Sequence, residues 1–224
     1  MIPWQRIDTT TIPGSTQRLR LLQRGDEFSI RGDSFELMNS RQHASEDALA
    51  RLACGCLTGR SNLSMLIGGL GMGFTLAAAL KEIGADSRVE VAELVPAVVR
   101  WNRGPLAGLA GNPLSDGRVT VHETDIAGML KSAAAVYDAI LFDVDNGPNG
   151  LTRKENDWLY GPEGLKAAYT ALRPGGVLAV WSVAPDSNFS LRLRRAGFSV
   201  EEVLSPAREM RKGGRHIIWL ASRN

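Results

Sequence analysis

A glycine-rich turn is the first stretch of the chain whose composition suggests chemistry; it contains Gly68, Gly69, Gly71 and Gly73. It follows a short apolar run at 63–67 and precedes a helix-like stretch at 74–83. Because glycine has no Cβ, such a turn lets the backbone approach a ligand and directs helix N–H groups at it. The third glycine of a dinucleotide fingerprint is replaced by Phe74 or Leu76, depending on the frame. The turn therefore predicts a nucleotide or nucleoside site that is not a dinucleotide site, with packing alone as the alternative.

Three acidic residues end or follow predicted strands, and they are Glu93, Asp125 and Asp143. In an open parallel sheet, ligands lie across the carboxyl ends of the strands. Glu93 comes 20 residues after Gly73, where a carboxylate can accept hydrogen bonds from both hydroxyls of a ribose. The alternative interpretation is that Glu93 is an ordinary surface acid at a strand end. Asp125 can accept a hydrogen bond from the amino group of an adenine while Ile126 packs on the adenine ring. Asp125 can equally cap the helix that begins at Ile126, and the two roles are compatible.

Asp143 opens a polar segment directly after the apolar strand 139–142, and Asp145 and Asn146 follow it. Carboxylates at the end of a strand can receive a cationic or amine group, and one of them can deprotonate an attacking ammonium. A polar turn is the alternative explanation, and it accounts for Gly147-Pro148 but not for acids placed against an apolar strand.

The elements that must position these residues alternate regularly from residue 63 onwards. Strands are predicted near 63–67, 88–93, 118–122, 137–143, 176–182, 198–203 and 215–221. Helices are predicted near 73–83, 95–103, 126–133, 155–172 and 187–196, and a further helix starts at Ser45. This alternation predicts an α/β fold with a doubly wound, seven-stranded, mostly parallel, Rossmann-like sheet, closed by a terminal hairpin that inserts one antiparallel strand.

The beginning of the chain has a different pattern. Short alternating stretches at 18–23, 27–31 and 35–38 are separated by Gly-Asp pairs, which predicts a small β-meander. Residues 1–15 are polar and contain prolines, and no strand is predicted there. We therefore expect an N-terminal β-extension at 1–43 and a catalytic domain at 44–224.

These motifs together resemble a known family. The glycine turn resembles motif I of class I S-adenosylmethionine (SAM) dependent methyltransferases. Combined with Glu93, Asp125, the segment 137–148 and the preceding meander, it resembles spermidine synthase and related aminopropyltransferases over roughly 26–182. The resemblance implies a SAM-methyltransferase-like fold in which the glycine turn, Glu93, Asp125 and Ile126 hold a sulfonium nucleoside.

The same resemblance implies roles around the acceptor. Asp143 would free the acceptor amine, with Asp145 as the adjacent acid and Asn146 at the acceptor site. Residues 151–172 would form a gate, with Trp158 and Tyr160 as its walls. Self-association, as a homodimer for instance, is expected from the family alone.

The departures from the family bear on the choice of donor. Spermidine synthases usually carry an aspartate where this chain has Gly71, and that aspartate pairs with the ammonium of decarboxylated SAM. Its loss removes an attraction for that ammonium and a repulsion against the carboxylate of intact SAM. Asn146 stands where a second acid is usual, and of the Tyr-His-Glu or Tyr-Gln-Glu motif only His43 and Glu46 lie near the register.

Composition limits the other function classes. A net charge of +2 with interspersed signs gives no case for nucleic acid, although the last third is locally basic. We find no apolar run of membrane-spanning length, no leader and no zinc pattern around Cys54 and Cys56, so a cytoplasmic protein without a metal is expected.

The leading hypothesis is methyl transfer from SAM to a small acceptor, an amine among the options, with Asp143 as base. Aminopropyl transfer from decarboxylated SAM is the alternative, and a non-catalytic nucleoside-binding or assembly protein is the second alternative.

Overall fold

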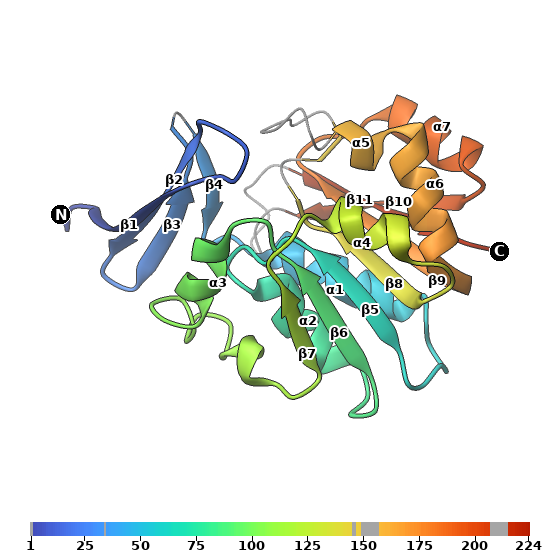
Figure 1. Cartoon of the computed structure of the whole chain (residues 1–224), viewed down its shortest axis with the longest axis horizontal. Coiled ribbons are helices and arrows are strands. Elements are labelled where there is room, and N and C mark those ends of the chain that lie inside the picture. The colour runs from blue at the N-terminus through green and yellow to red at the C-terminus, as the bar shows by residue number, and fades with distance from the viewer. Residues whose placement is uncertain (1, 34, 145–146, 149–156, 207–214) are drawn as a thin grey trace.

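The computed structural model describes residues 2–33, 35–144, 147–148, 157–206 and 215–224. The N-terminal part forms a four-stranded antiparallel sheet in the order β1-β2-β3-β4. Its strands are β1 (Gln5–Thr11), β2 (Arg18–Arg24), β3 (Glu27–Arg31) and β4 (Glu36–Asn39). Figure 1 shows this sheet in blue at one side of the larger one.

The prediction of a three-stranded meander was incomplete, because β1 precedes it. The sequence of β1 is Gln-Arg-Ile-Asp-Thr-Thr-Thr, and five of its seven residues are exposed. As an edge strand that pairs only with β2, it needs no alternation of apolar and polar residues, so its sequence gives no strand signal.

The larger sheet has seven strands in the order β10-β11-β9-β8-β5-β6-β7, which confirms the predicted fold class. The five strands from β9 to β7 are parallel, and β11 runs antiparallel between β9 and β10, as the terminal hairpin predicted. The strands are β5 (Ser64–Gly68), β6 (Arg88–Ala92), β7 (Val119–His122), β8 (Tyr137–Phe142), β9 (Leu172–Ser182), β10 (Ser199–Pro206) and β11 (Arg215–Ser222).

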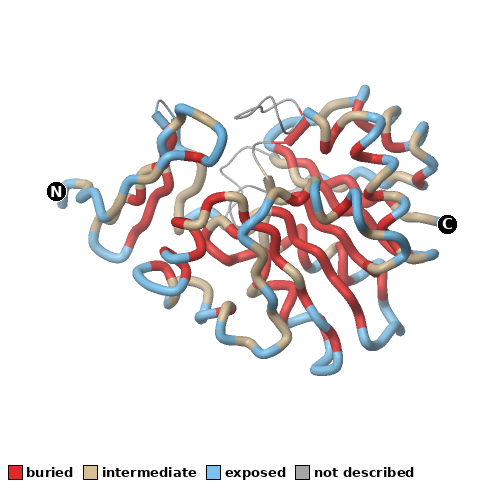
Figure 2. Tube along the Cα trace, viewed as in Figure 1, coloured by how far each residue is buried: buried red, intermediate tan, exposed pale blue. Residues whose placement is uncertain are grey.

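Helices cover both faces of this sheet (Figure 1). One layer contains α1 (Ala44–Gly55), α2 (Phe74–Glu82) and α3 (Pro96–Asn102), and the other contains α4 (Ile126–Ser132), α6 (Pro162–Ala171) and α7 (Ser187–Arg195). The side chains of β5 show why both layers are needed: Met65 and Ile67 belong to the core under the first layer, and Leu66 belongs to the core under the second. The central strands β5 and β8 are accordingly buried along their whole length, whereas the edge strands β7 and β10 are not (Figure 2).

The single helix predicted at 155–172 is wrong. The described part of that segment forms α5 (Asp157–Tyr160) and α6, and Gly161 between them has extended backbone. The reason is local: Pro162 disfavours helical backbone in the residue before it and is itself well suited to the first turn of a new helix. In addition, β9 begins at Leu172, which pairs with Tyr137, so the strand is longer than predicted.

The N-terminal sheet is fastened to the larger unit by shared core and by a polar contact. Leu21 and Ile30 belong to the same core cluster as the α1–α3 layer. The indole Nε1–H of Trp101 in α3 donates to Asp8 Oδ2 of β1 at 2.7 Å. Within the described ranges, no helix is both long and apolar enough to cross a membrane.

Candidate functional site

The order of the large sheet reverses at β5, which has β6 on one side and β8 on the other. Ligands of open α/β sheets bind outside the carboxyl ends of the strands at such a switch point. Here β5 leads into the glycine turn and β8 leads into Asp143, and the N–H of Asp143 donates to the carbonyl of Gly68 at 3.0 Å. The fold therefore brings the two sequence-predicted motifs together at one edge.

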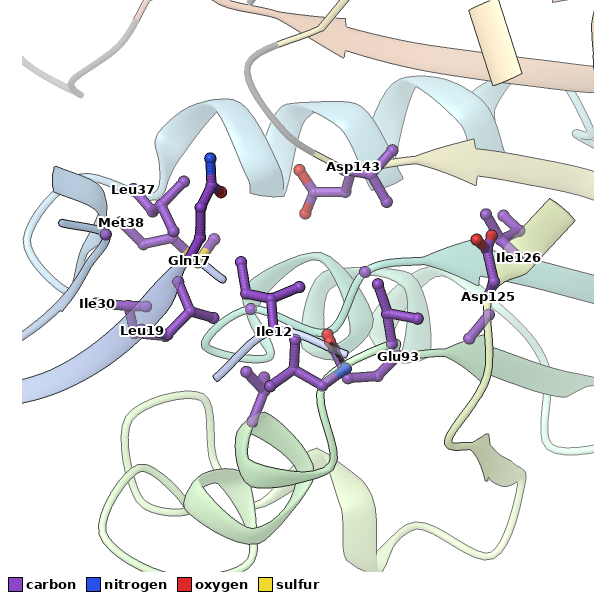
Figure 3. Close-up of a pocket in the computed structure, with 18 of the residues that line it drawn as sticks. Ile12, Gln17, Leu19, Ile30, Leu37, Met38, Glu93, Asp125, Ile126 and Asp143 are labelled. Carbon is purple, nitrogen blue, oxygen red and sulfur yellow. Dashed lines mark hydrogen bonds between the residues drawn. The ribbon is translucent and has the colours of Figure 1, made fainter. Parts of the chain in front are cut away.

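A pocket of about 310 Å³ lies at this edge, between the carboxyl ends of the strands and the N-terminal sheet. Figure 3 shows Asp125 and Ile126 at one end of it and Leu37, Met38 and Ile30 at the other. Its strand-end wall consists of Gly69, Gly71, Glu93, Asp125, Ile126 and Asp143. On the side of the N-terminal sheet, five apolar residues that line it are here called the apolar wall: Ile12, Leu19, Ile30, Leu37 and Met38.

The glycines of the turn are required by its geometry. Gly69 has φ of +87°, and a Cβ there would overlap the carbonyl oxygen of Asp143. A Cβ on Gly68 would overlap Ile126 Cδ1. Gly73, at φ of +84°, is the N-cap of α2, and the amide of Asn102 donates to the carbonyl of Gly71 at 2.8 Å, which holds the turn.

Gly71 also has a left-handed backbone, with φ of +52°. A Cβ on Gly71 would lie 2.6 Å from Sδ and Cε of Met38, which comes from β4. The position where related enzymes are expected to present a carboxylate is thus faced by a thioether.

Glu93 is buried, with 7% of its surface exposed, and lines the pocket just after β6. Its two carboxylate oxygens accept backbone N–H groups: Oε2 that of Leu70 at 2.9 Å and Oε1 that of Val95 at 2.8 Å. Burial raises the pKa of Glu93, although these hydrogen bonds oppose the rise. Each oxygen retains lone-pair capacity, so the carboxylate can accept a further hydroxyl.

Asp125 is the N-cap of α4, and its Oδ1 accepts the N–H of Ala127 at 2.8 Å. Asp125 also lines the pocket, as does the buried Ile126 beside it. The two interpretations left open by the sequence are therefore compatible: capping uses Oδ1, and the carboxylate still borders the pocket.

Asp143 lines the pocket at the end of β8 and accepts a hydrogen bond from the Thr75 hydroxyl of α2 at 2.6 Å. Burial raises the pKa of Asp143 to about 6, against the lowering effect of the Thr75 hydroxyl. A carboxylate with this pKa is deprotonated for the most part at neutral pH and is close to the range in which a general base works best.

Glu46 is a pocket residue to which the sequence assigned no role, although it lies near the register of the family's Tyr-His-Glu motif. It lies in the first turn of α1, where an acid is also favourable for the helix start. Burial, and next the neighbouring Asp143 carboxylate, raise the pKa of Glu46 to about 7. The two carboxyl groups thus face one space and carry at least one negative charge between them at neutral pH.

The remaining residues predicted at the acceptor side either lie outside the described residues or do not line the pocket. Asp145 and Asn146 lie outside the described residues. Trp158 contacts Lys131 and Glu163, and Tyr160 is buried and donates its hydroxyl proton to the carbonyl of Val144. Of the described part of this segment, Leu159 lines the pocket, and neither Trp158 nor Tyr160 does.

No metal site is apparent in the part of the chain that the structure describes, since no three His, Cys, Asp or Glu side chains are grouped to hold an ion there.

Solved structures of other proteins share this architecture. The spermidine synthase from Thermotoga maritima aligns over 98% of this chain and 73% of its own, with a TM-score of 0.77 and 20% sequence identity. The chain has the fold of a spermidine synthase. A spermidine synthase in complex with the transition state analogue AdoDATO aligns over 98% of this chain and 72% of its own, with a TM-score of 0.76 and 20% identity.

The wider class also matches. Human methyltransferase-like protein 13 in complex with SAH aligns over 81% of this chain and 80% of its own, with a TM-score of 0.57 and 20% identity. Neither a protein-family model nor a curated protein sequence matches the chain. The resemblance found in the sequence is confirmed as a spermidine-synthase-like form of the class I methyltransferase fold.

Proposed function

We propose that the protein is a SAM-dependent transferase that moves a methyl group to a small acceptor, with Asp143 as the base. The observation that carries this proposal is the position of Asp143. Its carboxylate lies at the carboxyl end of β8, where the strand order reverses, and lines the same pocket as Glu93 and Asp125. The solved structures with this fold include complexes with AdoDATO and with SAH, which supports a ligand of the SAM type.

The residues divide the work as follows. Glu93 would hold the ribose hydroxyls, Asp125 the adenine amino group, and Ile126 one face of the ring. SAM supplies a methyl group on a positively charged sulfur that is already a good leaving group. Asp143 accepts a proton from the acceptor, and Thr75 holds the Asp143 carboxylate in position. The N-terminal sheet supplies one side of the pocket and would limit the access of water to bound substrates.

Gly71 supports intact SAM as donor over decarboxylated SAM. A carboxylate at this position would attract the aminopropyl ammonium and repel the carboxylate of SAM. The thioether of Met38, which is uncharged, faces this position instead. Aminopropyl transfer remains the alternative, and the two carboxyl groups Glu46 and Asp143, which suit an amine acceptor, are compatible with both reactions.

The test is calorimetric titration with SAM, decarboxylated SAM, S-adenosylhomocysteine and methylthioadenosine. We expect SAM and S-adenosylhomocysteine to bind more tightly than the other two. A preference for decarboxylated SAM and methylthioadenosine would favour aminopropyl transfer, and binding of none of the four would favour the non-catalytic alternative.

The variant Gly71→Asp, with Gly71→Asn as its uncharged control, sharpens the test. Asp and Asn tolerate a φ of +52° better than most residues, and the Met38 tip that they would meet is flexible. We expect Gly71→Asp, but not Gly71→Asn, to shift the affinity ratio by about tenfold towards decarboxylated SAM. An unchanged ratio would remove this reason for placing methyl transfer first.

Self-association also stays a prediction, and analytical sedimentation of the full chain can check it.

A further inference from the structure

The apolar wall gives the pocket a second kind of surface. All five of its side chains belong to the N-terminal sheet or its loops, and three of them, Ile12, Leu19 and Ile30, are at most 7% exposed. Leu37 and Met38 are partly exposed and complete the wall. Figure 3 shows Leu19, Ile30, Leu37 and Met38 gathered at the end of the pocket away from Asp125 and Ile126.

The polar groups at this end carry no net charge. Gln17 is neutral. Arg18 and Asp33 lie at the exposed rim and pair with each other, with Nε and Oδ1 3.8 Å apart and both side chains more than half exposed. The unpaired negative charge among the residues that face the acceptor space therefore belongs to Glu46 and Asp143, which lie on α1 and at the end of β8.

We propose that the acceptor is a monoamine with an apolar body, whose ammonium group lies at Glu46 and Asp143 and whose body lies on the apolar wall. This proposal rests on the proposed function and adds the class of acceptor to it. In the reaction, the ammonium gives one proton to Asp143, and the freed nitrogen lone pair forms a bond to the methyl carbon. The carbon–sulfur bond breaks and its electron pair stays on sulfur, which becomes a neutral thioether.

A diamine fits the same space poorly. Its second ammonium would meet Leu19, Ile30 or Leu37, where the described residues offer no unpaired carboxylate. Burying a charge without a partner costs far more free energy than burying a methyl group gains. The apolar wall therefore favours a hydrocarbon chain at the place where a polyamine would need a carboxylate for its second ammonium.

Binding of simple amines to the full chain tests the proposal. The probes are butylamine, hexylamine and octylamine, with 1,4-diaminobutane and 1,8-diaminooctane as matched diamines, titrated with and without saturating S-adenosylhomocysteine. We expect affinity to rise about fourfold for each added methylene group that reaches the wall. We also expect octylamine to bind at least tenfold more tightly than 1,8-diaminooctane.

Two pairs of variants locate the ends of the amine. Leu37→Asp should weaken octylamine at least tenfold and strengthen 1,8-diaminooctane, whereas Leu37→Asn, of similar size and uncharged, should not strengthen the diamine. Glu46→Gln should weaken every monoamine, whereas Asp47→Asn should not, because Asp47 pairs with His43 and is not a pocket residue.

The outcomes separate the proposal from the function on which it rests. Amine affinities that do not change with chain length, diamines that bind as tightly as monoamines, or a failure of all amines to bind would each overturn the acceptor class. If S-adenosylhomocysteine still binds in those cases, the proposed function survives. If S-adenosylhomocysteine fails to bind while octylamine shows the expected series, the proposed function fails, and with it the role of the amine as acceptor, although the monoamine site itself stands.

Discussion

The two walls of the pocket obtain their chemistry in different ways. The strand-end wall depends on backbone position: parallel pairing sets β5, β6 and β8 side by side, and the residues after each strand then meet. The apolar wall depends on side-chain composition, since its residues come from one antiparallel sheet and its loops, and their side chains decide what the wall can contact. Under the proposed function, strand order would set the donor end of the pocket and side-chain identity would set the acceptor end.

The largest effect should come from Asp143→Asn, which keeps the shape of the strand-end wall and removes its base. We expect the turnover number for transfer to an accepted amine to fall at least about 100-fold, the range typical of a lost general base. The affinity for S-adenosylhomocysteine should stay within about twofold. Turnover is measured from S-adenosylhomocysteine formation. Asp47→Asn serves as the control, and unchanged turnover in Asp143→Asn would refute the base role.

Because the strand-end wall depends on backbone position, we expect Gly69→Ala to destabilise the protein strongly. The substitution meets both a φ of +87° and the carbonyl of Asp143, so we expect the free energy of unfolding to fall by about 2 kcal/mol, roughly 30-fold in the folding constant. Gly128→Ala is the matched control, because it lies in α4 with open space around it, and it should leave stability unchanged or slightly raised. Urea unfolding compares the two, and equal stabilities would contradict the importance of backbone position.

A smaller effect is expected from Glu93→Gln. The amide can accept with one oxygen only, so the N–H of Leu70 or of Val95 loses its partner and the ribose loses an acceptor. We expect S-adenosylhomocysteine to bind about tenfold more weakly, as measured by calorimetry. Glu123→Gln, at an exposed position, should bind it normally. Equal affinities in the two variants would exclude Glu93 from the nucleoside site.

The smallest effect concerns pH. Thr75→Val removes a hydrogen bond that stabilises the ionised form of Asp143, so the pKa of Asp143 rises further above its usual value. Because the base must be deprotonated, the rising limb of the pH–rate profile should move to higher pH. We expect a loss of about threefold at pH 6 and none at pH 8.5. Thr120→Val, on the exposed edge of β7, should leave the profile in place, and the same profile in Thr75→Val would show that this hydroxyl does not tune the base.

The sequence was sufficient for the strand-end wall because its signals are local. A glycine turn after an apolar run, and acids at strand ends, predict the same local structure whatever packs around them. The strand order, which the structure supplies, then brings Gly69 next to Asp143. The roles of Glu93, Asp125 and Asp143 in binding and catalysis stay predictions until the variants are measured.

The sequence was insufficient where side-chain direction depends on how a helix packs. Glu46 and Asp143 border one pocket because α1 lies against the large sheet near β8, and the sequence offered only the loose register of Glu46 with the Tyr-His-Glu motif as a signal. Trp158 and Tyr160 were predicted as walls of a gate, but α5 ends before Gly161 and presents Leu159 to the pocket instead. The signal for this break, Gly-Pro, was present in the sequence.

The apolar wall is encoded in one continuous piece of the chain. Its residues all precede residue 39, whereas the glycine turn and the three strand-end acids all follow residue 67. Under the proposed function, exchange of the segment before residue 39 would replace the acceptor surface and keep the donor surface, provided that the new segment fills the shared core as Leu21 and Ile30 do and offers an acceptor to Trp101 as Asp8 does. A library of such segments would then be a direct way to look for new acceptors in the laboratory.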